Sequence, residues 1–248
     1  MCVFEILEKK KMVSKKGTLY MVPCPIVEDG LTSLSAEAIL ILHRLDHFVV
    51  ERARTARRFI KTTDHPLPIS ELQIFELNKN APQEGLNQFL EKLLQGINIG
   101  VMSEAGCPGI ADPGNLAVQF AHKNDIRVRP LVGPSSILLA LIASGMNGQK
   151  FAFNGYLPNK GPELSKKLKM LEQKVQKANQ TQIFMEAPYR NEFILQHCIK
   201  VLSPNTKLCV ACDINADTEY IVTKPIKAWK GTDWKQFHKR PAVFLIGQ

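Results

Sequence analysis

The sequence has no apolar run that approaches the roughly 20 residues of a membrane-spanning helix. Its longest apolar stretch, "SSILLALIASG" at 135–145, has about the length of one buried helix. The first residues lack the uninterrupted apolar core of a secretion signal, because Glu5 and Glu8 interrupt it and a lysine cluster follows. We therefore expect a cytoplasmic protein that does not enter a membrane.

The sequence also lacks the cysteine patterns of disulfide-rich and zinc-binding proteins. Its 6 cysteines are expected to be thiols, as is usual in the cytoplasm. Cys209 and Cys212 have the spacing of a metal-binding pair, but no second pair of Cys or His accompanies them. They lie in a predicted strand, where residues three apart point to opposite faces. We expect buried thiols here and no metal site, and the histidines show no ligand spacing either.

Acidic residues are fewer than basic ones. There are 23 Asp and Glu against 32 Lys and Arg, which gives a net charge of +9 and a pI near 9.3. Such a charge attracts phosphate-rich partners, most obviously RNA. Many basic proteins bind no nucleic acid, so the charge favours an RNA partner without specifying one.

From Gly17 onward, strand and helix patterns alternate. A chain of 248 residues lies at the limit of one hydrophobic core, so we expect two domains. The alternation predicts an α/β fold with mainly parallel or mixed sheets and crossover helices. We expect an N-terminal extension at 1–16, an α/β domain at 17–132 and a second at 133–248. The predicted strands are 17–23, 47–51, 72–77, 97–103, 126–132, 151–158, 181–188, 207–214, 219–224 and 242–247.

Between these strands, apolar residues recur at helical spacing. A long helix is predicted around Leu164, Leu168, Leu171 and Val175, which follow one another at heptad spacing, and its lysines are expected to form a solvated face. A further helix is expected to begin at Pro134, because the first turn of a helix tolerates proline. The remaining predicted helices are 35–45, 52–60, 86–94, 115–123 and 189–202.

One loop is rich in residues that constrain the backbone. The stretch "IGVMSEAGCPGIADPG" at 99–114 follows a predicted strand and precedes a predicted helix. Gly106, Gly109 and Gly114 can take positive φ and let a ligand approach the main chain, while the prolines fix the backbone. In an open α/β sheet this edge binds ligands. The glycine spacing fits neither the P-loop nor the dinucleotide-binding pattern, so the loop is either a ligand loop of another kind or a plain β–α turn.

Five motifs occur in the order in which one known family has them. The chain resembles the tetrapyrrole-methylase-like S-adenosylmethionine-dependent methyltransferases, above all the branch that methylates a ribose 2′-hydroxyl of small-subunit ribosomal RNA. The resemblance runs from about Gly17 to the C-terminus. The family's "VSDAGTPGISDPG" stands here as "MSEAGCPGIADPG" at 102–114. The other motifs are "GTLYMVPCPI", "PLVGPSS", "FAFNGYLPNKG" and "IFMEAPYR".

The resemblance implies two α/β domains with S-adenosylmethionine as cofactor in the cleft between them, a homodimer, and ribosomal RNA as substrate. It places the cofactor against the glycine loop, the serines after the glycine turn, and single residues elsewhere. These residues are Pro25, Ala105, Gly106, Cys107, Pro108, Gly109, Ile110, Ser135, Ser136, Leu157 and Pro241.

The motifs of the acceptor side depart from the family pattern. The family's "AEDTR" is "VERAR" at 50–54, which keeps Glu51 and Arg54, and its "YHEHN" has become about "FELNKN", without either histidine. A hydroxyl acceptor must lose a proton, so we expect Glu51 to be the general base, and Arg54 is the second expected catalytic residue. Arg54 and Arg57 are expected to hold an acceptor phosphate or carboxylate, and Arg190 of "APYR" is also expected to bind the substrate. The structural alternative for Glu51 is an ion pair with one of the nearby arginines.

Two other functions remain open. In the first, the acceptor is a tetrapyrrole or another small molecule, an interpretation against which the basic charge argues. Alternatively, the chain is an RNA-binding member of the fold that has lost catalysis, an interpretation motivated by its altered acceptor motifs.

Overall fold

The computed structural model describes residues 16–77, 83–112 and 114–248. The expected extension, apart from Lys16, and Pro113 of the glycine loop lie outside the described residues. The chain divides into two compact units. The first comprises Met1–Cys24 with Leu31–Gly133, and the second comprises Pro25–Gly30 with Pro134–Gln248.

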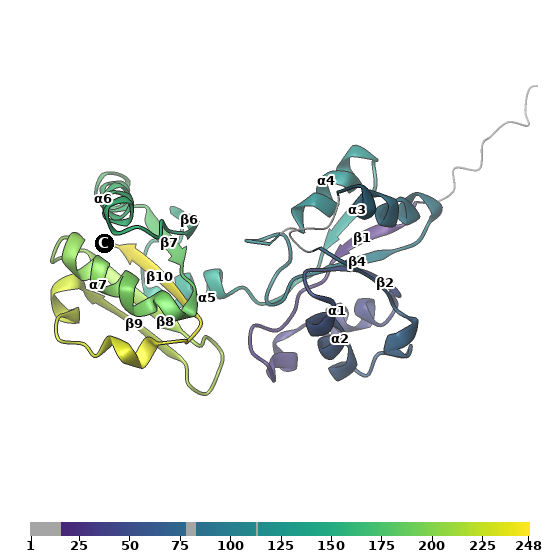
Figure 1. The fold of residues 1–248 in the computed structure, drawn as a ribbon, viewed down its shortest axis with the longest axis horizontal. Coiled ribbons are helices and arrows are strands. Elements are labelled where there is room, and N and C mark those ends of the chain that lie inside the picture. The colour runs from purple at the N-terminus through teal and green to yellow at the C-terminus, as the bar shows by residue number, and fades with distance from the viewer. Residues whose placement is uncertain (1–15, 78–82, 113) are drawn as a thin grey trace, which may run out of the picture. The chain divides into compact units, whose positions relative to one another are not determined.

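The first unit is built on a sheet of five parallel strands in the order β3-β2-β4-β1-β5 (Figure 1). Parallel strands need crossover connections, and the helices between the predicted strands supply them. The strands are β1 (Thr18–Met21), β2 (His47–Val50), β3 (Gln73–Glu76), β4 (Ile99–Met102) and β5 (Arg127–Pro130).

Two helices cover each face of this sheet (Figure 1). One face carries α1 (Ala36–Leu42) and α2 (Ala53–Thr62), and the other carries α3 (Gln83–Leu90) and α4 (Asn115–Lys123). The helix predicted at 86–94 is α-helical only to Leu90 and continues as a 3₁₀ helix, Glu91–Gln95. It ends at Gly96, whose φ of 91° is a left-handed conformation that closes helices.

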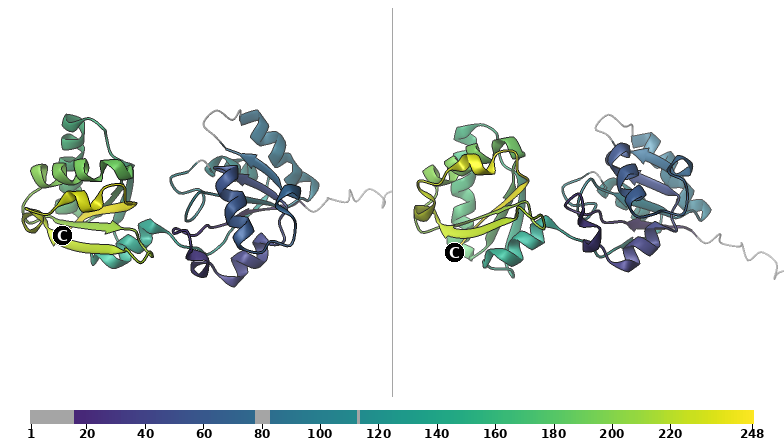
Figure 2. Two further views of the ribbon diagram at one scale, coloured as in Figure 1. Left: turned by 60° about the horizontal axis from the view of Figure 1, so that its bottom comes forward. Right: turned by 90° about the horizontal axis from the view of Figure 1, so that it is seen from below.

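The second unit is built on a mixed sheet in the order β6-β7-β10-β8-β9, whose elements can be followed in Figure 2. Only the β6–β7 pair is parallel. One face packs on α5 (Ser136–Ser144), and the other on α6 (Gly161–Ala178) and α7 (Asn191–Val201). The strands are β6 (Phe151–Tyr156), β7 (Thr181–Met185), β8 (Lys207–Cys212), β9 (Tyr220–Pro225) and β10 (Ala242–Gly247).

The core of the second unit confirms two sequence predictions. The apolar residues of α6 at heptad spacing are all buried: Leu164, Leu168, Leu171 and Val175. Cys212 belongs to this same core, whereas Cys209 belongs to the core beneath α5, so the two thiols lie on opposite faces of β8. The spacing that resembled a metal-binding pair is therefore that of a strand buried on both sides.

The longest apolar stretch of the sequence forms α5. The prediction that this helix begins at Pro134 is wrong, because Ser135 is its N-cap and accepts a hydrogen bond from the Leu138 N–H. A serine oxygen satisfies one of the free N–H groups of the first turn, and proline has no such group to offer. Within the described parts of the chain, no helix combines the length and apolarity needed to cross a membrane.

Candidate functional site

The glycine loop leaves the carboxyl end of β4, which lies between β2 and β1 in the first sheet. Backbone hydrogen bonds tie the segments that follow β1 and β2 to β4: the N–H of Val22 donates to the carbonyl of Val101, and the N–H of Glu51 donates to the carbonyl of Met102. The segments that follow β1, β2 and β4 therefore meet at one edge. In open parallel sheets this is the edge that binds ligands, and it is the candidate site of the first unit.

A short antiparallel bridge anchors the start of the glycine loop to the segment after β1. Cys24 and Gly106 exchange both backbone hydrogen bonds, at 2.9 and 3.0 Å. The Cys24 thiol donates to the carbonyl of Ser103 at 3.2 Å, and burial raises the pKa of this thiol to about 12. Cys24 is therefore a structural residue of the loop and not a nucleophile.

The far end of the loop is closed by Asp112. Its carboxylate accepts the N–H of Gly109 at 2.8 and 2.9 Å and the N–H of Gly114 at 2.7 Å. Gly106 and Gly109 adopt φ values of 73° and 86°, as the glycine pattern suggested. Gly114 does not: its φ is −60°, and a Cβ there would lie 2.8 Å from the Asp112 carboxylate. Its role is close packing, which the sequence did not distinguish from backbone freedom.

Between these anchors, exposed and buried residues alternate along the loop. Ala105, Gly109 and Ile110 are exposed, Gly106 and Pro108 are buried, and Cys107 is half-buried with its thiol 3.6 Å from the carbonyl of Gly133. Ile110 itself is an exposed apolar residue, with 49% of its surface accessible. Exposed peptide groups beside an apolar side chain suit a ligand that is partly flat and apolar and partly polar, as S-adenosylmethionine is.

Glu51 lies directly after β2, at the same edge as the loop. Its Oε2 accepts a hydrogen bond from the main-chain N–H of Glu104, 3.3 Å away. Burial raises the pKa of the Glu51 carboxyl, and the negative charges of Glu104 and Asp112 add to this effect. The Glu104 N–H and the positive charge of Arg52 oppose it without cancelling it.

The sequence reasoning did not single out Glu104, which follows β4 as Glu51 follows β2. Its carboxylate accepts the Thr55 hydroxyl at 2.9 Å and pairs with Arg52 at 3.5 Å. The expected alternative, an ion pair between Glu51 and Arg54 or Arg57, is not among the ion pairs of the described residues. The signal that could have drawn attention to Glu104 is that, like Glu51, it is an acidic residue close to the end of a predicted strand.

Arg54 and Arg57 lie on α2, one and two turns beyond Glu51, and both side chains are exposed. The N-terminus of α2 has no side-chain cap from Arg52, but the Ala53 N–H donates to Glu76 at 2.7 Å. The structure thus brings Glu51 to the glycine loop and leaves both arginines on the outer surface of the helix that follows.

The other predicted cofactor residues belong to the second unit. Ser135 caps α5, and Ser136 is its first residue. Leu157 is buried against α6 and α7, whereas Pro25 is half-buried. Pro241 is exposed, and its carbonyl accepts the N–H of Asp213 at 2.9 Å.

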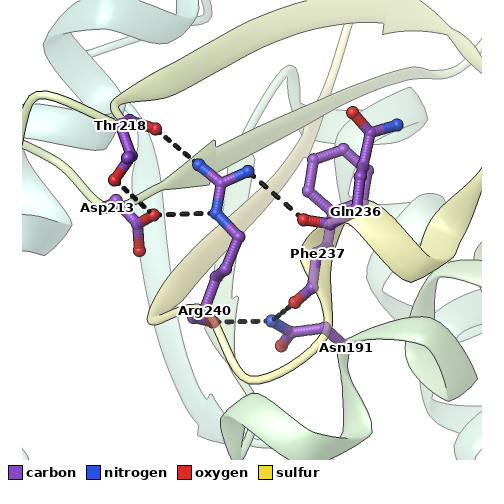
Figure 3. A network of polar contacts seen from close by, with 6 residues as sticks. All are labelled: Asn191, Asp213, Thr218, Gln236, Phe237 and Arg240. Atoms are coloured by element: carbon purple, nitrogen blue, oxygen red, sulfur yellow. Dashed lines mark hydrogen bonds and ion pairs between the residues drawn. The ribbon is translucent and has the colours of Figure 1, made fainter.

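A polar network holds the turn before Pro241 (Figure 3). The Arg240 side chain pairs with Asp213 at 2.7 Å and donates to the carbonyls of Thr218 and Gln236. The buried Asn191 amide donates to the carbonyls of Phe237 and Arg240, at 2.8 and 2.7 Å. The network fixes the backbone on the N-terminal side of Pro241.

Arg190, the second predicted substrate residue, lies beside Glu186 at 3.1 Å, at an angle that gives an ion pair but no hydrogen bond. The Glu186 side chain is 3% exposed, and its other oxygen accepts the Ala187 N–H. The Arg190 guanidinium also lies 4.8 Å from the ring centre of Phe193 and donates to the carbonyl of Asn159. Its charge therefore already balances that of a buried carboxylate.

No family model matches the chain. Ribosomal RNA small subunit methyltransferase I of Vibrio cholerae is 31% identical over 219 residues, covering 88% of this chain and 72% of the relative. Among solved structures, the methyltransferase CobJ has a TM-score of 0.63 at 16% identity, over 94% of each chain. Uroporphyrin-III C-methyltransferase from Thermus thermophilus, complexed with S-adenosylhomocysteine, has a TM-score of 0.56 at 14% identity, over 94% and 98%.

The two kinds of likeness support different statements. The solved structures share the fold of this chain at low identity, which makes the fold that of the tetrapyrrole methylases. The sequence relatives match most of both chains and share one description. The chain is therefore a methyltransferase and belongs to the ribosomal RNA small subunit methyltransferase I family.

Proposed function

We propose that this methyltransferase transfers a methyl group from S-adenosylmethionine to a ribose 2′-hydroxyl of small-subunit ribosomal RNA. The observation that carries the proposal is the position of Glu51, a carboxylate with a raised pKa that is hydrogen-bonded to the main chain of the glycine loop. The family to which the chain belongs supports ribosomal RNA as the acceptor.

The glycine loop would hold the cofactor through its exposed residues. Ala105, Gly109 and Ile110 are exposed, with Ile110 available to cover an apolar surface. Bound S-adenosylmethionine supplies an activated methyl group on a positively charged sulfur. The contacts that the resemblance implies from the second unit are Pro25, Ser135, Ser136, Leu157 and Pro241.

Glu51 would take the proton of the acceptor hydroxyl. A general base works best when its pKa approaches the working pH, and burial moves that of Glu51 in this direction. The Glu104 N–H holds one carboxylate oxygen, which restricts the rotation of the side chain. Arg54 and Arg57 would bind acceptor phosphates beside this base, whereas Arg190 would do so only while also balancing Glu186.

The test combines cofactor binding with methyl transfer. We expect saturable binding of S-adenosylhomocysteine in calorimetry, and incorporation of labelled methyl from S-adenosylmethionine into unmodified small-subunit ribosomal RNA. Nuclease digestion and mass spectrometry should then find the methyl on a ribose. Absence of S-adenosylhomocysteine binding would remove the proposal.

Two further outcomes would point to the alternatives. Labelling of a tetrapyrrole but not of RNA would make the acceptor a small molecule. Binding of the cofactor and RNA without turnover would indicate a member of the fold that has lost catalysis. The predicted cytoplasmic location and homodimer are part of the proposal, and sedimentation of the purified chain tests the dimer.

A further inference from the structure

We propose that the exposed cationic face of α2, formed by Arg54, Arg57, Arg58 and Lys61, binds the phosphate backbone of the RNA substrate. The inference rests on the proposed function for the identity of the RNA, and extends it from single residues to a continuous surface. We call these four residues the α2 basic face.

The four residues share one side of the helix. At 3.6 residues per turn, their positions fall within about 100° of one another around the axis. All four side chains are exposed. The opposite side is apolar, with Ala56 and Ile60 buried in the core beneath the helix. The helix is thus fixed to the sheet by one side and presents only cations on the other.

The charge of α2 is not balanced within the helix. Its sequence, ARTARRFIKT, contains four cations and no acidic residue. Cations three and four residues apart on a helix repel one another. Arg54 also lies in the first turn, where the helix dipole favours negative charge. Four cations on one exposed face attract an anionic partner such as the phosphates of RNA.

Another helix rich in basic residues, α6, provides a comparison within this chain. Its 18 residues carry five lysines, but Glu163 lies in its first turn and Glu172 also belongs to it. Its net charge is therefore five minus two, or +3 over 18 residues, compared with +4 over the 10 residues of α2. Lys169 and Lys177 of α6 are exposed and serve as matched controls.

The position of α2 in the fold matches the proposed chemistry. The helix begins two residues after Glu51, at the carboxyl edge of the first sheet. Phosphates lying along α2 would bring a nucleotide of the same strand to that edge. Arginine and lysine supply most phosphate contacts in nucleic-acid complexes, and these contacts set the register of the bound strand without reading its sequence.

The test measures how salt weakens RNA binding. For the full chain and an unmodified transcript of small-subunit ribosomal RNA, the affinity falls with rising salt, with a slope set by the number of phosphate contacts. We expect the double variant Arg58→Gln/Lys61→Gln to lower this slope by about 1 for each residue replaced. Lys169→Gln/Lys177→Gln removes the same charge from α6 and should leave the slope unchanged.

Equal slopes for the two double variants would overturn the proposal. Calorimetric binding of S-adenosylhomocysteine at wild-type affinity identifies folded variants, and the single variants Arg58→Gln and Lys61→Gln serve if the double variant does not fold. Failure of the proposed function looks different: the unaltered chain would then bind the transcript through α2 without methylating it. Conversely, the unaltered chain could methylate the RNA while the α2 double variant keeps the salt slope of the unaltered chain. That result would rule out the α2 basic face as an RNA-binding surface and leave the proposed function standing.

Discussion

The main-chain N–H of Glu104 donates to Oε2 of Glu51 across the ends of two neighbouring strands. The residue that orients the proposed base is therefore part of the loop that would hold the cofactor. A change in the backbone of that loop is transmitted directly to the carboxylate. We expect cofactor binding and proton removal to be coupled through this one hydrogen bond.

Replacing the proposed base should separate binding from chemistry. Glu51→Gln keeps the side-chain shape and an oxygen for the Glu104 N–H, but cannot accept a proton. We expect kcat for RNA methylation to fall about 10²- to 10⁴-fold, with little change in the affinity for S-adenosylhomocysteine. Single-turnover methylation and calorimetry measure the two quantities. Full activity of the variant would show that Glu51 is not the base.

The raised pKa of Glu51 predicts a pH dependence of activity. The carboxyl must be ionised to accept a proton, so kcat should rise with pH through the raised pKa, above the ordinary value of 4.5. Arg52 opposes this shift, so Arg52→Gln should move the midpoint to higher pH. Rate measurements from pH 5 to 8 on both proteins test this prediction, and a midpoint that moves to lower pH would contradict it.

The same shift also affects stability. Between pH 4.5 and the raised pKa, the folded chain binds more protons at Glu51 than the unfolded chain does. The contribution of Glu51 to the free energy of unfolding is therefore fully present below pH 4.5 and is lost as the pH rises through the raised pKa. Glu51→Gln should remove this part of the pH dependence of the free energy of unfolding, which urea denaturation at several pH values across that window measures. An unchanged pH dependence would contradict the assignment.

Gly109 offers a test of the loop with a matched control. Gly109 and Gly231 have φ values of 86° and 80°, so alanine at either position should cost roughly 1–3 kcal/mol of stability. Only Gly109→Ala should also weaken S-adenosylhomocysteine binding, roughly tenfold or about 1.4 kcal/mol. Thermal unfolding and calorimetry compare the two variants, and equal affinities would argue against a cofactor role for the loop.

Thiol labelling should report on the same loop. Among the described cysteines, Cys107 is half-buried and the others are buried, with burial raising the pKa of Cys24 and Cys198 to about 12. Burial raises the pKa of Cys107 as well, so its reaction is expected to be faster than that of the others because it is more accessible. In a Cys2→Ser background we expect one fast-reacting thiol, Cys107, which S-adenosylhomocysteine slows. Cys107→Ser should abolish the fast phase. A labelling rate that the ligand leaves unchanged would place the cofactor elsewhere.

The turn before Pro241 depends on a buried amide. Asn191→Ala removes hydrogen bonds to two backbone carbonyls and should lower the free energy of unfolding by roughly 1–3 kcal/mol. Asn205 is an exposed control, and alanine there should cost less than about 0.5 kcal/mol. Urea denaturation of the two variants compares the costs, and equal values would contradict the structural role of Asn191.

Much of the fold could be predicted because its signals are local. The apolar heptad of α6 and the short apolar strands lie within single elements, so spacing alone reveals them. Pro134 was misread because both proline and Ser135 suit the start of a helix, and only the backbone conformation decides between them.

The candidate site was harder to predict because it depends on strand order. Glu51 and Glu104 are far apart in the sequence and meet only because β2 and β4 pair. Nothing in the local pattern specifies that pairing. Similarly, Arg190 has the residue type of a phosphate ligand, but its ion pair with Glu186 depends on how the chain turns after β7.

The assignment of Pro25–Gly30 to the second unit has a consequence for dissecting the protein. The chain passes from one unit to the other three times, after Cys24, Gly30 and Gly133. Ile26 packs into the core beneath α5, so a fragment that starts at Pro134 lacks part of its own interior. No single cut yields two complete folding units, and a circularly permuted or co-expressed design would have to carry this six-residue segment with the C-terminal half.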